Sequence, residues 1–380
     1  MDFDFCEEHR ILKRTVHKFA GKEAADPAEK AEEQGFFPRE IFVTAAPLGF
    51  LGTPYPPTYE GCGPDMISTC LVIEGISKVS ASLGLGFMIQ TSVGTAPIYY
   101  FGSEYLKTQY LVPAIRGEKV SAFALTEPGS GSDAGSIQCR AKRNGGSYHL
   151  DGTKMFVSNS YVSDFLIAAV RTNPRAEGKQ GLSLLLVDRQ RSPYDVHPLR
   201  KLGLHGLDTS EVVFEQCRVP IGNLLGEEGE GFEYLKRILT ESRILTGASA
   251  LGVAKSAFDI AVKYASERIQ FGRKLSEFQT IRHKAADMCI EIEMAECLVY
   301  KSACLFNQGR KCDREASISK VFASEAANRT ASESLQILGG YGYMREYLVE
   351  RYFRDARAMM IFEGTSEIQR SIIAKSIFKT

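Results

Sequence analysis

Two glutamates near the end of the chain have the residue type and spacing for proton-transfer chemistry. Glu363 and Glu367 lie four positions apart in the stretch MMIFEGTSEIQR, residues 359–370. A carboxylate acts as a general base when it is aimed into a dry slot that raises its pKa towards the working pH. Most glutamates are instead solvated surface groups, and that interpretation is open for both residues on position alone.

The neighbours of the two glutamates differ. Glu363 follows the apolar run MMIF, whereas Glu367 follows a threonine and a serine. Ser366 and Gln369 have the spacing of a capping box, which predicts a helix that starts at Ser366 and carries Glu367 in its first turn. The helix dipole favours a charged carboxylate there and keeps its pKa low. Glu363 is therefore the better candidate for a base.

The composition argues against several classes of protein. The 46 basic residues balance 46 acidic ones, which leaves no basic surplus for a nucleic acid or an anionic membrane surface. Nine cysteines without a C-x-x-C pair indicate free thiols in a reducing compartment and no zinc site. The chain contains neither H-E-x-x-H nor G-x-S-x-G, so the common metalloprotease and serine hydrolase motifs are missing.

The amino terminus, MDFDFCEEHRILKRTVHKFA, begins acidic and enters a helical pattern. That pattern fits neither a signal peptide nor an arginine-rich transit peptide. No uninterrupted apolar run reaches the roughly 20 residues of a membrane helix. We expect a protein without a membrane span, located in the cytoplasm or, if the chain is a processed mature form, in the mitochondrial matrix.

The chain divides into three parts by its periodicity. Residues 1–118 look mostly helical, and residues 119–225 contain short alternating apolar segments that predict a small antiparallel sheet or barrel. Residues 226–380 show apolar residues at spacings of three and four, which predicts long helices that pack as a bundle. The positions that carry this helical pattern are Leu251, Ala254, Phe258, Ala261, Ala265, Met288, Ile292, Ala295 and Val299.

The segment LTEPGSGSDAGS, residues 125–136, contains G-x-G-x-x-A, which is the fingerprint of a dinucleotide-binding turn. A nicotinamide site of that kind needs a helix to open at the glycines, within a β-α-β unit. The residues that follow alternate as strands do, so we reject this interpretation. A loop of small residues remains, which lets a planar or phosphorylated ligand approach the backbone.

Five blocks in this order resemble the acyl-CoA dehydrogenase family over nearly the whole chain. They are LTEPGSGSDAGS, DGTKMFVSNS, ERIQFGRKLSEFQTIRHKAADM, QILGGYGY and RDARAMMIFEGTSEIQR. The resemblance implies an α+β, mostly α fold: an N-terminal helical domain, a central antiparallel β-barrel and a C-terminal four-helix bundle. It also implies FAD as the cofactor, a homo-oligomer, usually a tetramer, and an electron-transferring flavoprotein as the partner.

The resemblance assigns two groups of residues to FAD. Residues near the flavin ring are Phe123, Leu125, Thr126, Gly131 and Ser132, with Phe156 and Ser158 in the segment where the family has W-I-T and this chain has no tryptophan. Residues that reach FAD across a subunit interface are Arg268, Phe271, Gln279, Gln336, Gly339 and Gly340. Without the other blocks, these polar residues and glycines would be read as ordinary helix surface and a helix end.

The resemblance also implies a reaction and the residues that perform it. Glu363 aligns with the family's usual catalytic glutamate, which removes the α-proton of an acyl-CoA thioester while hydride leaves the β-carbon. Thr365 and Glu367 match FAD positions, and Ser132, Arg243 and Gly364 match substrate positions. The alternative base position on the helix that opens the bundle is a serine here, and the family's frequent aspartate three residues before Arg243 is a threonine.

The expected substrate is a neutral acyl-CoA. Glutaryl-type members carry an arginine in the segment that matches residues 80–99, and this chain has no charged residue there. The C-terminal blocks look most like the short-chain, butyryl-type branch, and branched or cyclic acyl groups also fit an apolar slot. Two alternatives stay open: an oxidase or related flavoenzyme on the same fold, and a non-catalytic binding or assembly protein.

Overall fold

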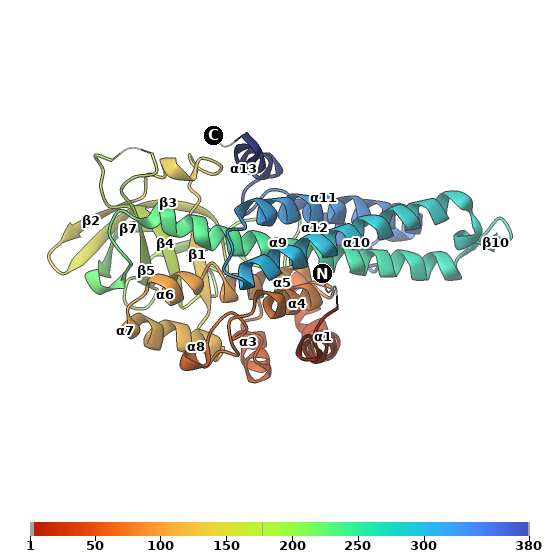
Figure 1. Ribbon diagram of the computed structural model, residues 1–380, viewed down its shortest axis with the longest axis horizontal. Helices are drawn as coiled ribbons and strands as arrows, with labels where there is room; N and C mark the ends of the chain where they lie inside the picture. Colours follow the sequence, from red (N-terminus) through yellow and green to blue (C-terminus); the bar gives the residue numbers. More distant parts are fainter. Residues whose placement is uncertain (1–3, 177, 379–380) are drawn as a thin grey trace.

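The computed structural model describes residues 4–176 and 178–378, so the outermost residues of the first and last predicted parts lie outside the described residues. Figure 1 shows a sheet at one end of an elongated molecule and long helices that run to the other end. The N-terminal helices lie along one side of these long helices, and α13 lies on the opposite side near the carboxyl terminus (Figure 1).

The N-terminal part is helical, as predicted. Asp65 and Ser80 cap two of its buried helices by accepting hydrogen bonds from backbone amides of the first turn. The helices of this part are α1 (Glu7–Phe19), α2 (Ala25–Gln34), α3 (Glu40–Ala45), α4 (Met66–Ser77), α5 (Ala81–Thr91), α6 (Ala96–Phe101), α7 (Glu104–Leu106) and α8 (Val112–Ile115).

The central part forms an eight-stranded sheet in the order β6-β7-β3-β2-β4-β5-β8, with β1 paired to β4. Strand β4 is buried along its whole length because both faces of the sheet are covered near it. The strands are β1 (Ser121–Ala124), β2 (Arg140–Asn144), β3 (Ser147–Ser158), β4 (Phe165–Arg171), β5 (Leu182–Asp188), β6 (Asp195–Pro198), β7 (Thr209–Pro220) and β8 (Leu224–Leu225).

The prediction of a closed antiparallel barrel is wrong. Strand β4 pairs in parallel with both β1 and β2, and the described strands form an open order that ends at β6 and β8. Alternating apolar residues reveal which face of a strand is buried but not the direction of its neighbour. The long connection from β1 to β4 allows the parallel pairing, which a short hairpin would exclude.

Three long helices dominate the C-terminal part: α9 (Gly231–Glu267), α10 (Gln279–Asn307) and α11 (Asp313–Leu338). The shorter α12 (Val349–Met359) and α13 (Ser366–Phe378) pack on α11, and the hairpin β9 (Ile269–Gln270) and β10 (Arg273–Lys274) forms the far tip (Figure 1). A partly buried lysine joins α4, α9 and α10, because Lys255 contacts Glu74 at 2.8 Å and Glu296 at 2.9 Å.

The largest hydrophobic core runs through all three parts. It contains Val16 of α1, Ile167 of β4, Leu251 of α9 and Met359 of α12, each at most 1% exposed. A second core lies on the other face of the sheet, and a third lies between the far ends of α9 and α11. The loops that carry the candidate site therefore rest on one continuous apolar interior.

Within the described residues, α9 is long and apolar enough to cross a membrane by length and composition. Of its most apolar window, 72% is buried inside the protein, as in the core helix of a soluble protein, so this is weak evidence for a span. All nine cysteines are free thiols.

Candidate active site

Glu363 lies on a tight turn between α12 and α13. Its φ of 53° and the φ of 85° at Gly364 both fall in the left-handed region. A non-glycine residue rarely adopts this conformation, and such strained positions gather at functional sites. A Cβ on Gly364 would lie 2.6 Å from Nε2 of Gln369, so the turn needs a glycine at that position. The turn thereby carries the carboxyl group of Glu363 in a fixed place.

Two fully buried side chains hold the backbone of this turn. Gln369 donates hydrogen bonds from Nε2 to the carbonyl oxygens of Glu363 and Gly364, both at 2.9 Å. The ammonium of Lys320, which reaches across from α11, donates to the same Gly364 oxygen at 2.8 Å. These bonds offset the cost of two successive left-handed residues.

The carboxyl group of Glu363 is enclosed by protein, although the residue keeps some exposed surface. Burial raises its pKa above the ordinary value of 4.5, because a charged carboxylate loses its hydration. A hydrogen bond from the hydroxyl of Ser242 to Oε2, at 2.6 Å, and the positive charges of Arg243 and Lys320 oppose that shift. Glu363 therefore lies in the kind of environment that raises the pKa of a general base above its ordinary value.

Glu367 lies in a contrasting environment. It is exposed in the first turn of α13, and hydrogen bonds from its own amide and from the Thr365 hydroxyl lower its pKa. The predicted helix is confirmed, but its predicted capping box is not. The hydroxyl of Thr365 accepts the hydrogen bond from the Ile368 amide at 3.3 Å, and Ser366 is buried behind it. A threonine–serine pair gives two candidate caps, and the turn geometry selects the first.

Arg243 is 9% exposed on α9, next to the serine that contacts Glu363. Burial lowers its pKa, while the charges of Glu363 and Asp313 raise it. Asp313 begins α11 and accepts a hydrogen bond from the hydroxyl of Thr240 at 2.6 Å. The carboxylate of Asp313 thus lies beside α9 at Thr240, the position where the family frequently has an aspartate. This contact could not be predicted from the sequence, because the two residues lie 73 positions apart.

The loop that follows β1 is fixed by a buried ion pair. Lys154 of β3 is 0% exposed and donates to the carbonyl oxygen of Leu125 at 3.0 Å and to Glu127 at 2.7 Å. The expected strand β2 follows the loop, after one short turn at Ala134–Ser136. Gly131 and Ser132 are exposed, and a Cβ on Gly131 would meet no atom within 4 Å. The start of the loop is therefore held in place by Lys154, whereas Gly131 and Ser132 further along it are open to solvent.

Phe123, Leu125 and Phe362 are partly buried and pack against the largest core, and the neighbouring Thr126 is partly buried. The register of β3 against β7 shifts between positions 154 and 157, which marks a bulge. At this bulge Phe156 has a φ of 58° and is 65% exposed. Ser158, at the strand end, contacts the hydroxyl of Thr209 at 3.2 Å.

The second predicted FAD group lies at the far ends of α9 and α11. Arg268, Gly339 and Gly340 line one open pocket of about 480 Å³, with the Arg268 guanidinium 5.7 Å from the centre of the Tyr341 ring. Phe271, Gln279 and Gln336 are exposed and do not line that pocket. Phe271 is 93% exposed on the hairpin at the tip of the molecule.

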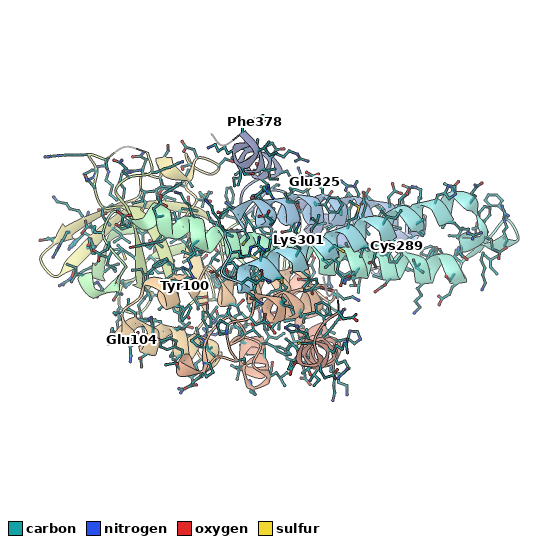
Figure 2. The ribbon with its side chains drawn as sticks, viewed as in Figure 1. Tyr100, Glu104, Cys289, Lys301, Glu325 and Phe378 are labelled. Atoms are coloured by element: carbon teal, nitrogen blue, oxygen red, sulfur yellow. The ribbon has the colours of Figure 1, made fainter. Side chains whose placement is uncertain are left out.

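Sequence reasoning missed a buried carboxyl group beside the site. Glu241 is 2% exposed, and burial raises its pKa to about 7, while a hydrogen bond with Tyr100 and the charge of Arg237 oppose the shift. Tyr100, labelled in Figure 2, lies in the last turn of α6, and the Arg237 guanidinium lies 3.8 Å from the centre of its ring. A charged residue in a helical sequence gives no signal of burial, so this cluster appears only in three dimensions.

Comparison with known proteins decides the family. The family models for the acyl-CoA dehydrogenase N-terminal domain, middle domain and C-terminal domain match residues 6–118, 122–217 and 229–378. The chain belongs to the acyl-CoA dehydrogenase family. It is accordingly an FAD-dependent oxidoreductase of fatty-acid metabolism, in a family whose members are typically homotetramers.

Individual relatives and solved structures match this chain over 97% or more of their own length. An acyl-CoA dehydrogenase of Bacillus subtilis is 44% identical over 97% of this chain and 97% of its own. The butyryl-CoA dehydrogenase structure from Megasphaera elsdenii is 35% identical, with a TM-score of 0.96 over 100% of both chains. A chain from a structural study of the electron-transferring flavoprotein of Acidaminococcus fermentans is 37% identical, with a TM-score of 0.97 over 100% of both chains.

Proposed function

We propose that the protein removes the α-proton of a neutral acyl-CoA thioester through Glu363 and thereby forms the 2-enoyl-CoA. The observation that carries this proposal is the enclosed carboxyl group of Glu363 on a doubly left-handed turn, with its pKa raised by burial. A general base contributes most when its pKa lies near the working pH. FAD, when bound, supplies the acceptor for the hydride from the β-carbon.

The other residues of the site would orient the base and the substrate and would exclude water. The Ser242 hydroxyl fixes one oxygen of the base, and buried Arg243 supplies positive charge beside it. We propose that the thioester is held near Gly364 and Ser132, and that Thr365 and Glu367 lie towards the cofactor. Open space beside Gly131, Gly339 and Gly340 is what a backbone needs to approach a ligand closely.

An oligomer is part of the proposal, because the two predicted FAD groups lie towards opposite ends of one chain. The loop after β1 belongs to the sheet end, and the pocket of Arg268 belongs to the tip of the long helices (Figure 1). A cofactor that needs both groups must bridge two subunits. We propose a tetramer with a C-terminal four-helix bundle, divided at residues 1–118, 119–225 and 226–380 and located in the cytoplasm or the mitochondrial matrix.

The proposed substrate is a short, branched or cyclic neutral acyl-CoA, and the proposed electron acceptor is an electron-transferring flavoprotein. The uncharged helix α5 supports the neutral acyl group, and the likeness to the butyryl-CoA dehydrogenase supports a short chain. The Acidaminococcus fermentans likeness supports the acceptor. An oxidase on the same fold would instead be reoxidised rapidly by air.

The decisive experiment is an anaerobic titration of the yellow holoenzyme with a panel of acyl-CoA thioesters, with flavin bleaching as the signal. Bleaching by a neutral acyl-CoA supports the cofactor, the reaction and the substrate class together. A colourless protein that binds acyl-CoA without reaction would favour a binding or assembly role. Readmission of air, compared with addition of an electron-transferring flavoprotein, then separates an oxidase from a dehydrogenase.

A further inference from the structure

The ammonium group of Lys320 is buried beneath the turn that carries Glu363. The side chain is 0% exposed, and its hydrogen bond goes to a backbone carbonyl, that of Gly364, at 2.8 Å. A buried ammonium is costly unless it gains compensating interactions. Burial lowers the pKa of Lys320 to about 8, and the negative charge of Glu363 is the largest influence that opposes this shift.

We propose that Lys320 is a positioning residue for Glu363: it holds the turn through the Gly364 carbonyl and keeps the adjacent carboxyl group ionised through its positive charge. This inference rests on the proposed role of Glu363 as the base. Two successive residues of the turn are left-handed, and the Gly364 oxygen accepts hydrogen bonds from both Lys320 and Gln369, so these two side chains restrain the backbone next to Glu363.

The charges around Glu363 come from three helices. Arg243 faces it from α9 and Lys320 from α11, and both stabilise the ionised form. Three further acidic groups face these two cations: Asp313 near Arg243, and Glu325 and Glu367 near Lys320. Glu325, labelled on α11 in Figure 2, is itself paired with Arg370 of α13 at 2.8 Å. Removal of Lys320 leaves Arg243 as the one cation that the described residues place against the carboxyl group.

Gln369 offers a matched control. It is also 0% exposed and donates to the same Gly364 oxygen, but it is neutral. Gln369→Leu therefore removes a restraint on the turn without removing a charge, whereas Lys320→Met removes both. Lys320→Arg restores the charge in a bulkier side chain, and Lys320→Gln keeps a donor but not the charge.

The test uses the purified holoenzyme and two readouts. One is the pH profile of flavin reduction by a saturating acyl-CoA. The other is an infrared titration of the Glu363 carboxyl group, assigned by difference from Glu363→Gln, which needs no turnover. We expect Lys320→Met and Gln369→Leu each to slow reduction on the order of 10²-fold, as for other misplaced catalytic groups. Only Lys320→Met and Lys320→Gln should move the protonation midpoint of Glu363 to higher pH, and Lys320→Arg should return it towards the wild-type midpoint.

The outcomes separate this inference from the proposed function. An infrared midpoint in folded Lys320→Gln or Lys320→Met equal to that of the wild type would overturn the role of Lys320, and so would an equal shift in Gln369→Leu. If Lys320→Met fails to fold, Lys320→Gln and Lys320→Arg carry the comparison. Full activity of Glu363→Gln would instead overturn the proposed function itself.

Discussion

The hydroxyl oxygen of Ser242 lies 2.6 Å from Oε2 of Glu363 and donates a hydrogen bond from α9 to the turn between α12 and α13. The resemblance to the family places Ser242 at the position of the alternative base, a role that a serine cannot fill. Its hydroxyl instead orients the carboxyl group of Glu363, which is the base we propose. It also stabilises the ionised form, because a charged carboxylate accepts a hydrogen bond more strongly than a neutral carboxyl group does.

Ser242→Ala should make the enzyme more sensitive to acid. The base works when deprotonated, so activity falls as pH drops through the raised pKa of Glu363, and loss of the hydrogen bond raises that pKa further. We expect a larger loss of flavin reduction rate at pH 6 than at pH 8, with an acid limb displaced to higher pH. Ser242→Thr keeps the hydroxyl and is the control. Equal losses at both pH values would contradict the proposed hydrogen-bond role.

Glu363→Gln and Glu367→Gln should have unequal effects. The first leaves an amide of the same shape, so folding, flavin colour and acyl-CoA binding should persist, while flavin reduction falls by at least ~10²–10⁴-fold. The second removes an exposed charge in the first turn of α13 and should be much milder. Stopped-flow bleaching rates make the comparison, and a reversed order of the two variants would rule out Glu363 as the base.

Acyl-CoAs with a neutral side chain should bleach the flavin, and glutaryl-CoA should not. The reason is the absence of any charged residue in positions 80–99, which include the whole of α5. A distal carboxylate buried there would lack a cationic partner and would pay its full desolvation penalty. Butyryl-CoA is the matched control in the same anaerobic titration. Comparable reduction rates with both thioesters would show that the pocket reaches a cation from another element.

Arg268→Ala should weaken FAD retention in the assembled protein without unfolding it. The side chain is exposed at the pocket between α9 and α11, so the fold does not depend on it. The FAD content per subunit after gel filtration, together with the elution volume, gives the result. Lys263→Ala, a change at an exposed residue of α9 shortly before Arg268, is the control. A monomer that holds FAD at full occupancy would refute a cofactor shared between subunits.

Glu241→Gln should stabilise the protein at alkaline pH and have little effect at acid pH. The pKa of Glu241 is raised to about 7 in the folded protein from an ordinary value of 4.5. The folded state therefore binds its proton more tightly than the unfolded state does. Its contribution to stability is present below pH 4.5 and is lost as pH rises through 7. Thermal unfolding of Glu241→Gln and the wild type is compared at pH 5 and pH 9. The free energy of unfolding of the variant should exceed that of the wild type by about 1–3 kcal/mol at pH 9 only. A gain of equal size at both pH values would show that Glu241 does not titrate in this way.

The sequence predicted the order of helices, sheet and helices because each part has its own periodicity. It also distinguished Glu363 from Glu367 correctly in the direction of their pKa values, because an apolar run and a helix start are local signals. It failed on strand direction and on the identity of the cap at Thr365. It could not find Lys320, which is 43 positions from Glu363, because a lysine in a helix ordinarily faces solvent.

The continuous core has a consequence for how the chain reaches its structure during synthesis. Val16 and Met359 belong to the same buried cluster, and 343 positions separate them in the sequence. The earliest helices emerge from the ribosome long before the strands and helices that cover them. The apolar surfaces of α4 and α5 that α9 and α12 cover stay exposed until those helices have been made, so this is the stage of synthesis at which a chaperone would be needed. A ribosome stalled before residue 349 would hold a chain that cannot yet close its interior.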